Sequence, residues 1–271
     1  MTRFTQVLNE AIREFITRGF TSAEQLDDWM ARVRAAAEGE LISERRMQHM
    51  MQERLGAIYR RLVQRGEILR KHPGVSRFTL DRIAPHLRAE LDRRIMASAN
   101  LIKLNRTSAI EKTLQRFAGW ATSIPQGGTE IAQQRETVAA VKKGVAGLPF
   151  VERRVLIDQG QKLASAINET LANDAGALAA VWEHHYSLHP REDHQERNGK
   201  VFLIRNSWAH KAGLVKPNDD GYYDDIEKPG EYVFCRCTAR YVYNLRSLPA
   251  DMLTAKGKAK LEEIRNNRNA A

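Results

Sequence analysis

The two cysteines of this chain, Cys235 and Cys237, are separated by a single arginine in the stretch EYVFCRC, residues 231–237. A disulfide between them would close a very small, strained ring, because bridging requires Cα and Cβ separations that so short a loop rarely supplies. Three roles remain for the pair: ligands of a metal completed by distant residues, two small buried apolar side chains, or reactive thiols.

A cluster of histidines precedes the cysteines and enlarges the pool of metal ligands. Zinc prefers cysteine and histidine and usually takes four ligands in tetrahedral geometry. The spacing matches no standard zinc finger, so the sequence offers a ligand pool without a unique set. We expect His194, Cys235 and Cys237 to bind Zn²⁺, with His189 or His185 as the fourth ligand. Five of the eight histidines fall in this cluster: His184, His185, His189, His194 and His210.

Two other interpretations of these residues stay open. Histidine near a strand edge is often a hydrogen-bonded structural residue, and free cysteine often packs as a small apolar side chain. Alternatively, His194 could act as a general acid or base in a metal-independent or zinc-dependent, toxin-like nuclease, with Arg191, Arg236 or Lys200 stabilising a phosphorane-like transition state. No Ser-His-Asp order, HExxH, P-loop or GxGxxG pattern supports an enzyme.

The stretch VWEHHYSLHPREDHQERNGKVF, residues 181–202, together with the later FCRC, resembles the signature of phage head morphogenesis proteins, the Mu F-like minor head family. Members carry a tryptophan entering a strand, an Arg-x-x-His or Cys-x-x-Cys pair, a Gly-Lys-Val-Phe-like strand and a closing Cys-Arg-Cys. The resemblance covers residues 160–247. The matching residues here are Trp182, Arg191, His194, Gly199, Lys200, Val201, Phe202, Cys235, Arg236 and Cys237.

The sequence departs from the family pattern at two places. The usual aspartate and the basic residue after it are replaced by Ser187 and His189, and the Pro-Asn before the closing motif is replaced by Val233-Phe234. Because Arg191 stands where some relatives carry cysteine, a four-cysteine zinc site is impossible here.

The resemblance implies a virion component made in the host cytoplasm and located in the head interior or at the portal vertex. Such a protein acts in capsid assembly, DNA packaging or DNA delivery, with the portal protein and other capsid proteins as partners. It implies no catalytic residue.

Charge favours an anionic partner. The 271 residues include 43 Lys and Arg against 33 Asp and Glu, giving a net charge of +10, so non-specific affinity for double-stranded DNA is expected. Arginines are frequent in residues 60–94, where they either contact phosphates or form a solvated face with internal ion pairs. No apolar run is long enough to span a membrane, and the amino terminus lacks a secretory leader pattern.

The spacing of apolar residues predicts an α+β fold, with a mainly helical amino-terminal region and a small, loop-rich carboxyl-terminal module. We predict a helical region over 1–125, a linker with helices over 126–179, the Mu F-like module over 180–249 and a charged, helix-prone tail over 250–271. The first predicted helix begins near Phe4 and ends at Gly19, and the second begins at a Thr21–Glu24 capping box. Further helices are predicted over 40–71, 85–104, 108–122 and 150–171. The predicted strands are 200–204, 231–234 and 238–245.

Overall fold

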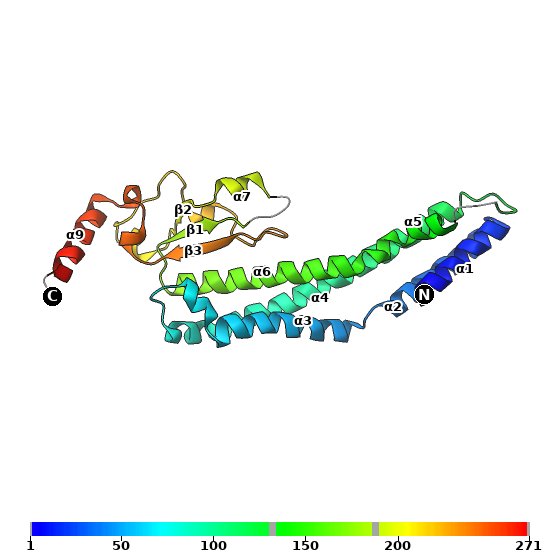
Figure 1. Ribbon diagram of the computed structural model, residues 1–271, viewed down its shortest axis with the longest axis horizontal. Helices are drawn as coiled ribbons and strands as arrows, with labels where there is room; N and C mark the ends of the chain where they lie inside the picture. Colours follow the sequence, from blue (N-terminus) through cyan, green and yellow to red (C-terminus); the bar gives the residue numbers. More distant parts are fainter. Residues whose placement is uncertain (1, 130–133, 186–189, 270–271) are drawn as a thin grey trace. The chain divides into compact units, whose positions relative to one another are not determined.

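The computed structural model describes residues 2–129, 134–185 and 190–269. Contacts within the chain define two compact units, each discontinuous in sequence. One comprises Met1–Gln52 and Met96–Leu156, and the other comprises Glu53–Ile95 and Ile157–Ala271. The long helices α3 (Glu44–Tyr59), α4 (Arg77–Ala121) and α6 (Leu148–Asp174) contribute residues to both units (Figure 1). The α+β fold class is confirmed, since helices predominate and the described residues include a three-stranded sheet.

The first unit is a set of helices packed around an apolar core. It contains α1 (Arg3–Arg18), α2 (Ala23–Glu40) and α5 (Gln134–Ala146) together with parts of the long helices. The rings of Phe15 and Phe117 meet edge to face at a centroid distance of 5.6 Å, a favourable aromatic geometry. Burying each large side chain of this core contributes about 1.5–3 kcal/mol. The core includes Phe4, Leu8, Ile12, Phe15, Trp29, Val33, Ile110, Leu114, Phe117 and Val141.

The ends of the first two helices follow known capping chemistry. Gly19 ends α1, as predicted, with a φ of 75° that favours glycine. The predicted Thr21–Glu24 box is wrong by one residue. Ser22 is the N-cap of α2, and its Oγ accepts the N–H of Gln25 at 3.2 Å. The Gln25 side chain accepts the N–H of Thr21, the residue before the N-cap, at 3.0 Å, so Gln25 bonds back to the start of the helix much as the third residue of a capping box does.

The single helix predicted over 40–71 is interrupted. α3 ends at Tyr59, and a π-helical turn, η1 (Arg60–Gln64), and a 3₁₀ turn, η2 (Glu67–Lys71), follow it. Gly66 separates these turns with a φ of 73°, a left-handed conformation that an α-helix cannot contain. The predicted end of this helical segment at His72 is confirmed, because His72 is the C-cap of η2.

The prediction of separate helices over 85–104 and 108–122 is wrong, because α4 is one helix of 45 residues. Pro85 lies inside it, although proline removes a backbone donor and usually begins or breaks a helix. Ile83 and Leu87 on either side of the proline are buried. Tertiary packing of this apolar face therefore outweighs the local preference.

Buried Arg106 stabilises α4 between residues 104 and 108, where the sequence predicted a gap between two helices. Arg106 donates from Nε to a carboxylate oxygen of Glu152 at 2.5 Å and from a terminal nitrogen to the carbonyl of Ile42 at 2.9 Å. These bonds satisfy a charged group that is only 8% exposed. They join three segments of the first unit at a position where the sequence predicted a loop.

The second unit carries a small antiparallel sheet. Its strands are β1 (Ala179–Glu183), β2 (Val201–Leu203) and β3 (Thr238–Val242), in the spatial order β2-β1-β3. The strands predicted over 200–204 and 238–245 are confirmed as β2 and β3. Trp182 and Tyr241 belong to the apolar cluster on one face of the sheet, and Leu203 and Val242 to the cluster on the other.

The strand predicted over 231–234 is wrong, because this segment forms turns. The N–H of Cys235 donates to the carbonyl of Tyr232 at 3.2 Å, and Phe234 has a φ of 60°. An extended strand needs neither feature, and a positive φ is unusual for a bulky side chain. The turn reverses the chain just before β3.

The sheet packs on the carboxyl-terminal part of α6 (Figure 1). The side chain of Asn168 donates to the carbonyl of Ala239 at 2.8 Å, and that of Gln161 donates to the carbonyl of Cys237 at 3.4 Å. The remaining elements are α7 (Glu192–Glu196), α8 (Trp208–Lys211), η3 (Tyr223–Asp225), η4 (Leu245–Ser247), η5 (Ala250–Met252) and α9 (Ala255–Asn269), which lies in the predicted helix-prone tail.

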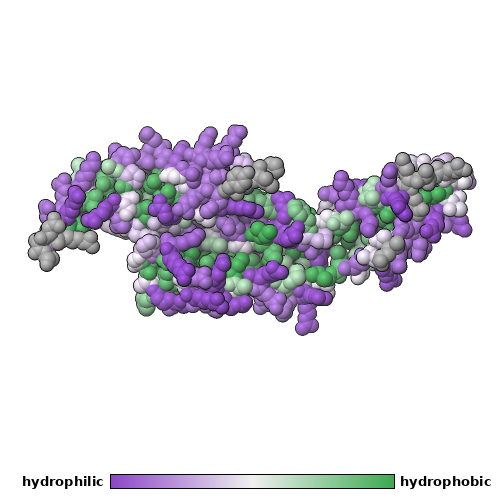
Figure 2. Space-filling view, viewed as in Figure 1, coloured by the Kyte–Doolittle hydropathy of each residue, from purple (hydrophilic) through white to green (hydrophobic). Residues whose placement is uncertain are grey.

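Polar residues cover most of the face in view, with smaller apolar areas between them (Figure 2). Within the described ranges, every helix is too short or too polar to cross a bilayer.

Candidate metal centre

His194, Cys235 and Cys237 share one buried site in the second unit. Nδ1 of His194 lies 3.5 Å from Sγ of Cys235 and 3.6 Å from Sγ of Cys237. All three donor atoms lie within 4.8 Å of one another, and each side chain is at most 4% exposed. The paired thiols therefore fold back against the histidine-bearing segment, as the sequence predicted.

Local structure brings these residues together from distant positions. His194 lies on α7, and the chain after it returns toward β1 through Gly199, whose φ is 80° and whose N–H donates to the carbonyl of Trp182 at 2.8 Å. Cys237 directly precedes β3. The register pairs Glu183 with Thr238, so the end of β1 and the start of β3 are neighbours.

That register places a fourth candidate ligand, His184, beside the thiol of Cys237. Nδ1 of His184 lies 3.5 Å from Sγ of Cys237, and its backbone N–H donates to the side chain of Asn198 at 2.9 Å. The sequence predicted His189 or His185 instead. His185 is exposed, and its Nε2 lies 3.0 Å from the hydroxyl of Thr238. His189 lies outside the described residues.

The donor spacing fits tetrahedral zinc. With Zn–S and Zn–N bonds of about 2.3 and 2.0–2.1 Å, a tetrahedral ion separates its nitrogen and sulfur ligands by about 3.6 Å. Nδ1 of His194 lies 3.5 and 3.6 Å from the sulfurs of Cys235 and Cys237, which matches this value, and Nδ1 of His184 lies 3.5 Å from the sulfur of Cys237. His184 is not part of the group of three donors that all lie within 4.8 Å of one another. Hydrogen bonding alone accounts for the site less well, because a neutral imidazole has one acceptor nitrogen and Nδ1 of His194 faces two sulfurs.

Hydrogen bonds shift the pKa values of the two thiols in opposite directions. The hydrogen bond from the thiol of Cys237 is the main cause that lowers the pKa of Cys235 to about 5, and the N–H of Gly230 adds to it by donating to the Cys235 sulfur at 3.4 Å. The same bond raises the pKa of Cys237, because its proton is held between the two sulfurs. Thiolate is the form that binds metal, so the lowered pKa of Cys235 favours metal binding.

The other ring nitrogen of His194 is buried without a hydrogen-bond partner among the described residues. The nearest carboxylate oxygen, Oδ2 of Asp193, lies 3.7 Å from this Nε2. Metal-bound histidines commonly present their second nitrogen to a carboxylate, which fixes the ring orientation. Trp182 contacts the His194 ring edge-on at 5.1 Å, and Tyr232 stacks on it at 5.8 Å. These aromatic rings restrict access of water to the site.

The residues that the nuclease interpretation requires do not form a shared site open to a substrate. His194 is 2% exposed, which leaves little surface for a nucleic acid substrate. Arg191 donates to the carbonyl of Val233 at 3.0 Å and lies over the ring of Tyr232. The ammonium of Lys200 lies 4.0 Å from the carboxylate of Asp220, and Arg236 is exposed.

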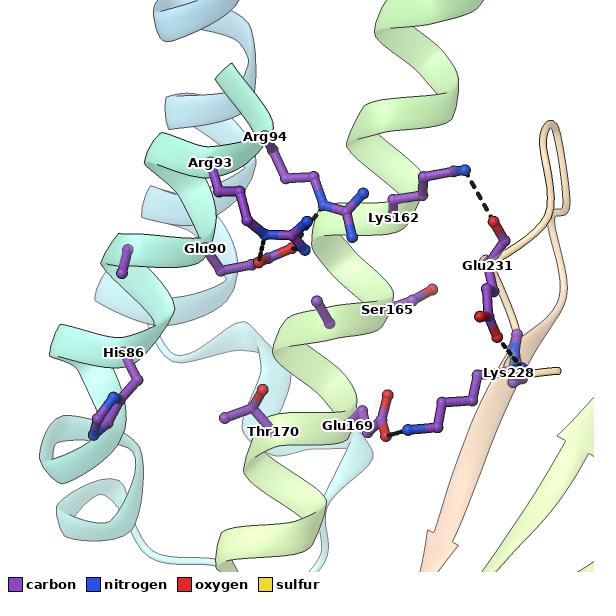
Figure 3. A pocket seen from close by; sticks show the side chains of 14 residues that line it. His86, Glu90, Arg93, Arg94, Lys162, Ser165, Glu169, Thr170, Lys228 and Glu231 are labelled. Carbon is purple, nitrogen blue, oxygen red and sulfur yellow. Dashed lines mark hydrogen bonds and ion pairs between the residues drawn. The ribbon is translucent and has the colours of Figure 1, made fainter. Parts of the chain in front are cut away.

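A separate cleft of about 600 Å³ lies between α4, α6 and the 228–231 turn of the same unit (Figure 3). Its charged side chains are largely paired with each other. Arg93 and Arg94 both donate to the carboxylate of Glu90, at 2.6–2.8 Å, and Lys228 forms an ion pair with Glu169. These arginines, which belong to the arginine-rich segment 60–94, therefore match the interpretation of a solvated face with internal ion pairs.

Comparison with known proteins adds no relative to this description: no family model, no curated protein and no solved structure matches the chain.

Proposed function

We propose that this chain is a minor head protein of a phage virion, in which a bound zinc ion closes the carboxyl-terminal module. The observation that carries the proposal is the shared buried site of His194, Cys235 and Cys237, whose members are 41 and 43 residues apart in sequence. These residues are also those on which the resemblance to the Mu F-like family rests. A motif whose separate parts meet in space is better explained by one local role than by separate ones.

The zinc ion in this proposal is structural. His194, Cys235 and Cys237 supply three of the four ligands of a structural zinc ion, and His184, which lies 3.5 Å from the sulfur of Cys237, would complete the set by moving closer to the other donors. Three of these side chains are buried and His184 is half-buried, and with all four bound no ligand position would be left for water or substrate. Binding to a site of this kind contributes directly to folding free energy, because the unfolded chain does not hold the ligands together. The ion would thus join α7 and the 230–237 turn to the sheet.

The burial of His194 favours this structural role over the nuclease alternative. General acid or base catalysis requires the imidazole to reach the substrate within hydrogen-bond distance. Incubation of the full chain with DNA and with RNA tests the difference. The proposal expects no cleavage, whereas cleavage that His194→Ala abolishes would support the nuclease.

Location in the particle tests the assignment to a virion. We expect the chain to co-purify with assembled heads and to lie at the portal vertex or inside the head in a cryo-electron microscopy map. The full chain should also bind a ring of portal protein. Absence from purified particles, together with a distribution on host DNA, would instead indicate a cellular nucleic-acid-binding protein.

Non-specific affinity for packaged DNA forms part of the proposal. The net charge of +10 supports it. Arginines already paired with acids are poor candidates for phosphate contacts. Among the described residues, no acidic side chain forms an ion pair with the exposed Arg54, Arg60 or Arg65, so we assign the contacts to these side chains.

A further inference from the structure

The two edge strands of the small sheet differ in how many of their outward-facing backbone groups are hydrogen-bonded. The outer edge of β2 is closed by the following loop. The N–H of Leu203 donates to the carbonyl of Gly221 at 3.0 Å, and the N–H of Val201 donates to the carboxylate of Asp220 at 3.1 Å. This edge therefore has no free row of donors for another chain.

The outer edge of β3 is closed only along its first part. Successive carbonyls of a strand point to opposite sides. The carbonyl of Val242 faces β1, where it accepts the N–H of Leu178 at 2.6 Å, so the carbonyls of Ala239 and Tyr241 face outward. Asn168 caps the carbonyl of Ala239. In the described part of the chain, neither a strand nor a side-chain amide caps that of Tyr241.

A groove of about 390 Å³ adjoins this uncapped part of the edge. Residues 239–244 form one wall without a break, and the turn that contains Arg70, Lys71 and Pro73 contributes the other. All of these residues belong to the second unit. The groove therefore runs beside residues 239–244 and reaches the uncapped carbonyl of Tyr241, where an added strand would bond.

The groove is also positively charged. Arg70 and Lys71 are exposed and form no ion pair with the acidic residues that the structure describes. Arg240, from β3 itself, is 58% exposed and lies 3.4 Å from the carboxylate of Glu183. Three cations thus face one acid, which favours an acidic occupant and disfavours a basic one.

We propose that this groove binds an extended, acidic segment of a partner protein, which adds to the sheet as a fourth strand beside β3. Backbone groups of Tyr241 and of Tyr243 just beyond the strand would bond to the segment, and Arg70, Lys71 and Arg240 would pair with its acidic side chains. Backbone bonds supply affinity in this mode of recognition, and the flanking charges select the sequence. The inference does not depend on the zinc ion or on assignment to a virion.

Fluorescence anisotropy with the full chain tests the proposal. The probe is a labelled peptide of about eight residues that alternates valine with glutamate, long enough for one strand. We expect saturable binding that weakens about tenfold or more in Arg70→Glu/Lys71→Glu. The control Arg45→Glu/Arg46→Glu makes the same charge change at exposed positions of the first unit and should bind as the unaltered chain does. Circular dichroism checks that both variants are folded.

A second peptide distinguishes strand addition from simple charge attraction. N-methylation of alternate residues leaves every glutamate in place and removes the backbone donors that would face β3. We expect this peptide to lose most of its affinity. Equal binding of the methylated peptide, no saturable binding of the parent peptide, or stronger binding of single-stranded DNA at Arg70 and Lys71 would each overturn the proposal.

Discussion

Nδ1 of His194 lies 3.5 Å from Sγ of Cys235, although 41 residues separate them in the sequence. The contact joins α7, which follows β1, to the turn that precedes β3. Both groups are buried, so each must be satisfied within the protein. A metal ion satisfies both sulfurs and the imidazole at once, and this is why we place the ion at the centre of the module's stability.

The fourth ligand can be identified by comparing two adjacent histidines. His184→Ala should weaken zinc binding at least about tenfold, because even residues that only support a ligand cost 10–100-fold. His185→Ala is the matched control, since His185 is exposed and lies against Thr238 rather than the thiols. Competition with a chromophoric chelator measures both affinities. Equal affinities in the two variants would remove His184 from the ligand set.

Acid should destabilise the second unit through His72. The ring is 1% exposed, its Nε2 lies 2.8 Å from the side-chain oxygen of Asn168, and its Nδ1 contacts the hydroxyl of Tyr243. Burial lowers the pKa of His72 to about 4, whereas the unfolded chain retains about 6.5. The unfolded state therefore binds the proton more tightly. The stabilisation is complete above about pH 6.5 and falls by about 3 kcal/mol as the pH drops toward 4.

Urea unfolding at several pH values measures this effect. The comparison between the unaltered chain and His72→Gln isolates one residue, because glutamine cannot titrate. We expect the difference in unfolding free energy between the two proteins to shrink between pH 7 and pH 4.5, within the window that the two pKa values define. A difference that stays constant with pH would mean that His72 is not buried as a neutral ring.

Gly230 should tolerate no side chain. It has a φ of 86°, and an added Cβ would lie 2.5 Å from Oγ of Ser165 on α6. Gly221 is the matched control, since its φ of 82° is similar but an added Cβ would meet no atom within 4 Å. Gly221→Ala should cost about 1 kcal/mol from backbone strain alone. Thermal unfolding should show a clearly larger loss for Gly230→Ala, and equal losses would contradict the close packing of the turn on α6.

DNA affinity should depend on the unpaired arginines. Replacing Arg54, Arg60 and Arg65 together with glutamine should weaken binding and reduce the slope of log K against log salt, by about 0.9 for each phosphate that is no longer neutralised. Arg93→Gln serves as the control, because Arg93 is already engaged by Glu90. Filter binding at several salt concentrations measures the slopes. An unchanged slope in the triple variant would assign the phosphate contacts elsewhere.

Sequence periodicity predicted the features that depend on local patterns. The apolar face of α1, its end at Gly19, and the strands β2 and β3 all follow from the spacing of apolar and β-branched residues. The meeting of His194 with the cysteines also agrees with the prediction, which rested on the preference of zinc for cysteine and histidine ligands.

Features that depend on tertiary structure could not be predicted in this way. Local rules placed a helix start at Pro85, but burial of the flanking residues keeps α4 continuous. The stretch EYVF, residues 231–234, has strand propensity, yet it forms turns that return Cys235 toward His194. The choice of His184 depends on the pairing of β1 with β3, which the sequence pattern does not specify.

X-ray absorption at the zinc edge of the freshly purified full chain tests the central claim most directly. The account predicts one zinc ion per chain, with two sulfur ligands at about 2.3 Å and two nitrogen ligands at about 2.0–2.1 Å, and loss of the ion in Cys237→Ser. Protein that folds cooperatively without stoichiometric zinc, and whose stability a chelator leaves unchanged, would contradict it.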